Sequence, residues 1–216
     1  MPGIIGEKGW GLLCPKTRPE RALKIERYAA EYLEPMLVHF PELNGRVYLA
    51  LRKFGWLAEY NPVLHIIIRE EALESYSEWR MRATTAHELV HLVQFINGEA
   101  LGKGVSIEVE RQATFLTFSR GFAFDFLKAF SASCTHDACK RDFKLCYYNC
   151  GLLFSRCCRD YTESELRSKA RQLETLSQSY GVHDHPNYFR LVGQAMAAEE
   201  ENTSQRTARE AACQVH

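Results

Sequence analysis

The chain has 216 residues, 46% of them hydrophobic and 25% charged, which is enough to bury the core of one or two domains. Its 27 basic and 27 acidic residues cancel, so no net charge attracts it to nucleic acid or to an anionic membrane. No stretch reaches the roughly 18 uncharged apolar residues that a membrane-spanning helix needs. We therefore expect a protein that binds no nucleic acid and spans no membrane.

The first residues carry Pro, Glu and Lys where a signal peptide needs a continuous apolar run, which favours a cytoplasmic location. Thr17 and Pro19 then predict a helix that begins near Arg18. We expect this helix to end around Pro35 or Pro41.

Three short segments rich in β-branched and aromatic residues follow, and they predict strands over residues 46–52, 56–60 and 63–69. Asn61 and Pro62 separate the second strand from the third. Because the links are short, we expect an antiparallel β-meander. His65 lies inside the third strand, and we interpret it as a core or sheet-face residue rather than a metal ligand.

Residues 87–91 read H-E-x-x-H and are the most informative part of the chain. On a helix, His87 and His91 lie four positions apart on one face, where both imidazoles can bind one Zn²⁺ at about 2.0–2.1 Å. Glu88 lies beside them and can accept a proton from a zinc-bound water. The motif therefore predicts two metal ligands and a general base.

The surroundings of the motif predict a helix over residues 79–97. Ser75 or Ser77 is placed to cap its start, and Gly98 is placed to end it. Apolar residues recur at helical spacing on this segment: Trp79, Ala83, Ala86, Leu89, Val90, Val93 and Ile96.

A second helix is expected to begin after Ser106 and to continue through Gly121 toward Phe130. Its first turns carry two acids, Glu108 and Glu110, which point in roughly opposite directions, so only one of them can face the motif helix.

A catalytic zinc site usually has a third protein ligand and one open position. We take Glu110, which shares a face with Ala113 and Thr114, as the third ligand, and Glu108 stays the alternative. A downstream histidine in that role is available only at His136 or beyond.

H-E-x-x-H followed by Glu on a downstream helix resembles the gluzincin metallopeptidases, of which thermolysin is the best-known member. Residues 110–115 also resemble the E-x-x-A-N-x-F-A helix of small minigluzincin and ImmA/IrrE-type peptidases, with Thr114 in place of Asn and Thr117 in place of the second Ala. The resemblance covers residues 47–117. The metzincin extension H-x-x-G-x-x-H is missing after His91.

This resemblance implies an α+β, zincin-like fold and peptide-bond hydrolysis by a metal-activated water. It also implies that a substrate peptide pairs with the edge of the strand before the motif helix. We expect zinc on His87, His91 and Glu110 to lower the pKa of its water to about 7, while Glu88 takes the proton and returns it to the leaving amine. Further donors for the oxyanion are available by residue type: Tyr180, His183, His185 and Tyr188.

Six of the eight cysteines lie within residues 134–158. On a helix, the steps of 7, 4 and 7 from Cys139 to Cys157 fall close to one line, so we interpret them as a stripe of small apolar side chains. A second metal site with His136 and a set of disulfides are the alternatives. Cys14 or Cys213 could also bind the zinc as a latency switch.

Thr162 and Glu165 form a capping-box pattern that predicts a helix to about Ser179. A loop from Gly181 to Pro186 and a last helix over residues 187–198 complete the C-terminal part. We expect three regions: a zincin-like metallopeptidase domain at 1–131, a Cys-rich helical subdomain packed on it at 132–198, and a polar, disordered tail at 199–216.

The sequence thus predicts a zinc-dependent metallopeptidase whose partner is a peptide or protein substrate; it indicates no oligomeric state. The first alternative is a zinc-binding regulatory or interaction protein on the same scaffold with little or no proteolytic activity. The second is a helical structural module in which H-E-x-x-H has no metal.

Overall fold

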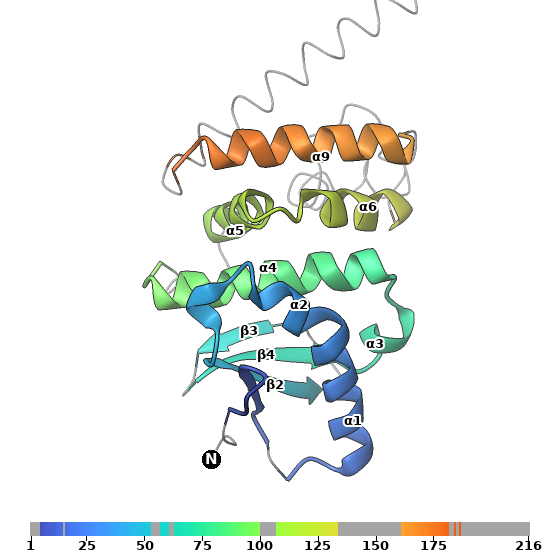
Figure 1. Ribbon diagram of the computed structural model, residues 1–216, viewed down its shortest axis with the longest axis vertical. Coiled ribbons are helices and arrows are strands. Elements are labelled where there is room, and N and C mark those ends of the chain that lie inside the picture. The colour runs from blue at the N-terminus through green and yellow to red at the C-terminus, as the bar shows by residue number, and fades with distance from the viewer. Residues whose placement is uncertain are drawn as a thin grey trace, which may run out of the picture.

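The computed structural model describes residues 5–14, 16–52, 57–60, 63–99, 107–133, 161–181, 184 and 186. The chain is α+β, with a small sheet and a larger helical part. Figure 1 shows these parts as layers, with the sheet below helix α4. Helices α5 and α6 lie above α4, and α9 lies above α5 and α6. The described elements are β1 (Trp10–Leu12), α1 (Pro19–Tyr28), a π-helical turn (Ala29–Leu33), α2 (Glu34–Leu37), a 3₁₀ turn (Pro41–Leu43), β2 (Val47–Arg52), β3 (Leu57–Tyr60), β4 (Leu64–Arg69), α3 (Ala72–Ser75), α4 (Glu78–Ile96), α5 (Ile107–Ser119), α6 (Ala123–Ser133) and α9 (Glu163–Gln178).

The four described strands form one sheet in the order β1-β2-β4-β3. β1 and β2 are parallel, β2 and β4 are parallel, and only β3 runs antiparallel to its neighbour β4. The expected antiparallel meander is therefore wrong, although all three expected strands exist within a residue of their predicted ends. Strand β1 was not expected, because three residues carry too little pattern to predict a strand.

The strand order places β4 between β2 and β3, although β3 precedes β4 in the chain. β4 is paired on both sides, and its residues Leu64 to Ile68, all apolar except His65, are buried throughout.

The N-terminal helix begins at Pro19 and continues through the π-helical turn to Leu37, within the expected limits. Arg18 occupies the N-cap without a side-chain hydrogen bond. The π-helical turn lies just before Pro35, whose ring would collide with the carbonyl four residues earlier in a regular α-helix. There the backbone N–H of Glu34 donates to the carbonyl of Ala29, five residues back.

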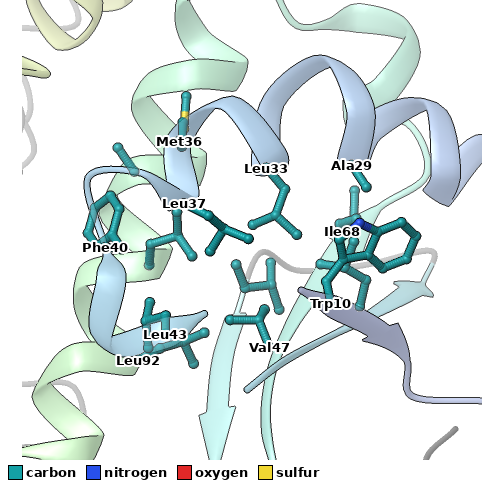
Figure 2. Close-up of a cluster of buried hydrophobic side chains, with 14 of the residues drawn as sticks. Trp10, Ala29, Leu33, Met36, Leu37, Phe40, Leu43, Val47, Ile68 and Leu92 are labelled. Carbon is teal, nitrogen blue, oxygen red and sulfur yellow. The ribbon is translucent and has the colours of Figure 1, made fainter. Parts of the chain in front are cut away.

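Two apolar clusters hold the described elements together. The first lies between the sheet, α1, α2 and α4, and Figure 2 shows part of it, with Leu33, Phe40, Val47 and Leu92 among the labelled side chains. The second joins α4 to α5, α6 and α9 around Phe115 and Phe118. Because α4 contributes to both clusters, the motif helix is fixed from two sides.

Helix α4 buries ten of its 19 residues, which is more than a single apolar stripe provides. Ser77 is the N-cap, and its Oγ accepts a hydrogen bond from the backbone N–H of Arg80. Gly98, at φ +74°, ends the helix, with N–H bonds from Gly98 and Glu99 to earlier carbonyls as in a Schellman motif. The expected helix and its terminal glycine are confirmed, but Ile96 is 38% exposed rather than part of the core.

The expected single helix from residue 107 toward Phe130 is wrong, because the chain forms two helices, α5 and α6. Gly121 adopts φ +89°, and the N–H groups of Gly121 and Phe122 donate to the carbonyls of Phe118 and Thr117. This is again a Schellman ending. The glycine therefore ends α5, and the next helix begins two residues later, where Glu174 of α9 accepts the backbone N–H of Ala123.

Helix α9 confirms the predicted capping box of Thr162 and Glu165 and ends near the expected Ser179. It packs on α5 and α6. The cysteine cluster, His136 and the expected last helix and tail lie outside the described residues. In the described part of the chain, no helix has both the length and the apolarity to cross a membrane.

Candidate metal centre

The two motif histidines lie on one face of α4, as their spacing predicts. Their rings are 4.6 Å apart between centroids and meet nearly at right angles. The Nε2 atoms of His87 and His91 approach to 3.1 Å, so both rings direct the same nitrogen toward one point. The side chains are 19% and 13% exposed, which leaves the point accessible to a small ion.

Helix α5 brings a carboxylate to the same point. Glu110 Oε2 lies 3.0 Å from His87 Nε2, and Glu110 Oε1 lies 3.5 Å from His91 Nε2. The three side chains form the one group of metal-ligating type found among the described residues. Glu108 is exposed on the same helix. The structure thus brings Glu110, and not Glu108, to the histidines.

The spacing of these donor atoms fits one tetrahedral ion. Zinc binds nitrogen and carboxylate oxygen at about 2.0–2.2 Å, and a tetrahedron of that size has edges of roughly 3.3 Å. His87 Nε2 lies 3.1 Å from His91 Nε2 and 3.0 Å from Glu110 Oε2, close to that value. The other carboxylate oxygen, Oε1, lies 3.5 Å from His91 Nε2. Two imidazoles and one carboxylate are also a ligand set that catalytic zinc sites use, with the fourth position left for water.

The charges around the histidines favour a cation. Burial alone would raise the pKa of Glu110, but hydrogen bonds with His87 and His91 hold it well below its usual range, so the carboxylate is ionised. Burial also opposes charge on His91, yet its hydrogen bond with Glu110 and the negative charges of Glu88 and Glu110 raise its pKa above 6.5.

Glu88, the expected general base, is a buried carboxyl residue, 8% exposed. It follows His87 directly, and its negative charge contributes to the raised pKa of His91, so it lies within electrostatic reach of the histidines. It is not a member of the three-residue group. Its position is therefore compatible with a role beside the ligands, and that role stays a prediction.

Sequence reasoning missed a residue that contacts this group. Gln94 is fully buried, and its Oε1 lies 2.7 Å from Nδ1 of His91. Its amide nitrogen donates to the carbonyl of Val109 and to Oε1 of Gln112 in α5. The available signal was a glutamine three positions after His91 within the apolar part of the helix, where polar groups need partners.

Other predicted participants lie elsewhere or outside the described residues. His65 is buried in β4, 2.9 Å from the carbonyl of Val63 through its Nδ1, as a core residue would be. Tyr180 packs against the second apolar cluster. His183, His185 and Tyr188 are not among the described residues.

Comparisons of the chain with protein-family models, with curated proteins and with solved structures find no match. The candidate centre therefore stands on its own residues and geometry.

Proposed function

We propose that the protein is a zinc-dependent metallopeptidase that hydrolyses peptide bonds. The observation that carries this proposal is the convergence of two imidazoles and a carboxylate. His87 Nε2 and His91 Nε2 are 3.1 Å apart, and the two oxygens of Glu110 lie 3.0 Å from His87 Nε2 and 3.5 Å from His91 Nε2. In this arrangement the three residues would hold the ion. Hydrolysis then needs one more group to move protons, and the motif supplies Glu88.

Bound zinc would polarise both a water molecule and the scissile carbonyl. Glu88 has a buried carboxylate next to the ligands and accepts the proton that the water loses. The same carboxyl group then donates this proton to the nitrogen of the leaving amine. His87, His91 and Glu110 keep their positions throughout, because α4 and α5 belong to packed apolar clusters.

The arrangement of the sheet supports an extended peptide as the substrate. The expectation that the strand before the motif helix offers its edge does not hold, since β4 is paired on both sides. β3 instead forms the end of the sheet and contacts α4. In the described part of the chain no strand pairs with the outer side of β3. Main-chain hydrogen bonds along such a free edge can recognise extended peptides.

The test is hydrolysis of a mixed pool of fluorogenic peptides by the zinc-loaded full chain. We expect Glu88→Gln to keep the zinc and to lower the rate about 10²- to 10⁴-fold. Glu108→Gln, which changes an exposed acid on α5 in the same way, serves as the matched control and should keep the wild-type rate. Zinc binding without hydrolysis in the wild type would contradict the peptidase and favour the regulatory or interaction protein.

A further inference from the structure

Gln94 is the polar residue that joins the two helices of the candidate metal centre. Its side chain is fully buried on α4, and it has three partners within hydrogen-bond distance. They are His91 Nδ1 at 2.7 Å, the carbonyl of Val109 at 3.0 Å and Gln112 Oε1 at 2.7 Å. The amide thus uses its acceptor on one side and both hydrogens on the other.

The backbone carbonyl of Val109 determines which way this amide points. A carbonyl oxygen only accepts hydrogen bonds, so the group facing it at 3.0 Å must be the NH₂ of Gln94. The opposite orientation would place two oxygens against each other in a buried site, and a rotation of the Gln112 amide cannot relieve that contact. Oε1 of Gln94 therefore faces His91.

This orientation in turn determines the tautomer of His91. Because Oε1 of Gln94 only accepts, Nδ1 of His91 carries the hydrogen. In the neutral ring Nε2 is then left with its lone pair, and Nε2 is the atom that lies 3.1 Å from His87 Nε2 and 3.5 Å from Glu110. The nitrogen that faces the proposed ion is the one that can bind it.

The same amide also holds the turn that carries the third ligand. Val109, whose carbonyl accepts from Gln94, directly precedes Glu110 in the first turns of α5. A shift of this turn would therefore stretch the bond to Gln94 as well as displace Glu110. One side chain on α4 thus connects the ring of His91 to the backbone next to Glu110.

We infer that Gln94 is a positioning residue of the metal centre, which sets the metal-binding tautomer of His91 and fixes the helical turn that bears Glu110. The inference rests on the proposed metal site. It differs from that proposal because it makes a statement about His91 that can be measured without any metal.

The first measurement is zinc affinity, by competition with a chromogenic chelator. We expect Gln94→Met, which keeps the length of the side chain and removes its polar groups, to weaken zinc binding about 10- to 100-fold. Thr117→Val is the matched control, because Thr117 is fully buried on α5 and its hydroxyl donates within its own helix, to Ala113. This control should keep wild-type affinity. Equal affinities of Gln94→Met and wild type would overturn the inference.

The second measurement is the tautomer of His91, read from the ¹⁵N shifts of its ring in the metal-free protein at alkaline pH. Wild type should show the Nδ1–H form, and Gln94→Met should lose it. Gln94→Glu keeps an acceptor for His91 but loses both donors, so it should retain the tautomer while binding zinc less tightly than wild type. An Nε2–H ring in the wild type, or a tautomer unchanged in Gln94→Met, would overturn the inference.

These two readouts separate the inference from the proposed function. A wild type that binds no zinc but has an Nδ1–H ring that Gln94→Met loses would contradict the metal site and the role of Gln94 in it, while still showing that Gln94 sets the tautomer of His91. If wild type and Gln94→Met bind zinc equally tightly and have the same His91 tautomer, the metal site would stand and Gln94 would have no role in it.

Discussion

At the scale of single residues, the three side chains of the candidate centre bring several acceptors and few hydrogens to one point. The Nε2 atoms of His87 and His91 are 3.1 Å apart, so only one hydrogen fits between them. Glu110 accepts but cannot donate when it is ionised. A positive charge at their meeting point satisfies all of them, and either a proton or a metal ion can provide it.

Competition between a proton and a metal ion predicts how zinc binding depends on pH. The pKa of His91 is raised above 6.5, whereas that of Glu110 is held well below its usual range. A proton on His91 must leave before its nitrogen can bind zinc. We therefore expect affinity to fall about tenfold per pH unit as the pH drops below the pKa of His91, measured by competition with a chelator of known protonation. An affinity that does not change over this range would contradict the proton competition.

At the scale of elements, the glycines at the ends of α4 and α5 matter because they adopt positive φ. A Cβ added at Gly121 would meet no atom within 4 Å, so the cost of a larger residue comes from the left-handed backbone alone. We expect Gly121→Ala to lower the free energy of unfolding by about 1 kcal/mol in urea titrations. Gly6 is the control: it also has open space for a Cβ, but its φ is not positive, so Gly6→Ala should be nearly neutral.

The contact between α4 and α6 includes an ion pair whose two partners differ in burial. Arg82 donates to Asp125 at 2.6 Å, and the two side chains are 31% and 7% exposed. Burial raises the pKa of Asp125 above 3.8, although Arg82 opposes this shift. Folding therefore favours the protonated form of Asp125. The contribution of Asp125 to stability consequently declines as the pH rises above 3.8 and the carboxyl group ionises.

Removal of Arg82 alone should be costly. Because it leaves a buried carboxylate without its partner, we expect Arg82→Met to lower the free energy of unfolding by about 2 kcal/mol at neutral pH, and by less near pH 4, where Asp125 becomes protonated. The double variant Arg82→Met with Asp125→Leu should be close to wild type, as determined from urea titrations of all four proteins. An additive loss in the double variant would contradict this account.

At the scale of the whole molecule, the local patterns of the sequence predicted elements better than their arrangement. Ser77, Gly98 and Thr162 mark helix ends by local hydrogen bonds, and these ends are where the sequence placed them. The strand order β1-β2-β4-β3 differs from the order along the chain, and no periodicity in the sequence indicates which strands pair. The break at Gly121 was visible as a glycine, but a single glycine is tolerated inside a helix, so the sequence analysis continued the helix through it.

In the candidate centre, too, local spacing could be predicted from the sequence, whereas contacts between helices could not. His87 and His91 followed from spacing on one helix, and Glu110 followed from the helical face and from a family resemblance. Gln94 could not be assigned, because its role depends on how closely α5 approaches α4 and on the carbonyl of Val109, which any residue type would provide. A hydrogen bond to a backbone carbonyl does not depend on the residue type, so the sequence cannot indicate it.

The central claim is that His87, His91 and Glu110 bind one zinc ion. The most direct test is the zinc content per chain of protein purified without chelator, measured for wild type and single variants. We predict about one zinc in the wild type, in Glu88→Gln and in Glu108→Ala, and loss of zinc in His91→Ala and Glu110→Ala. A wild type without zinc, or a Glu110→Ala variant that keeps it, would contradict the three-ligand centre.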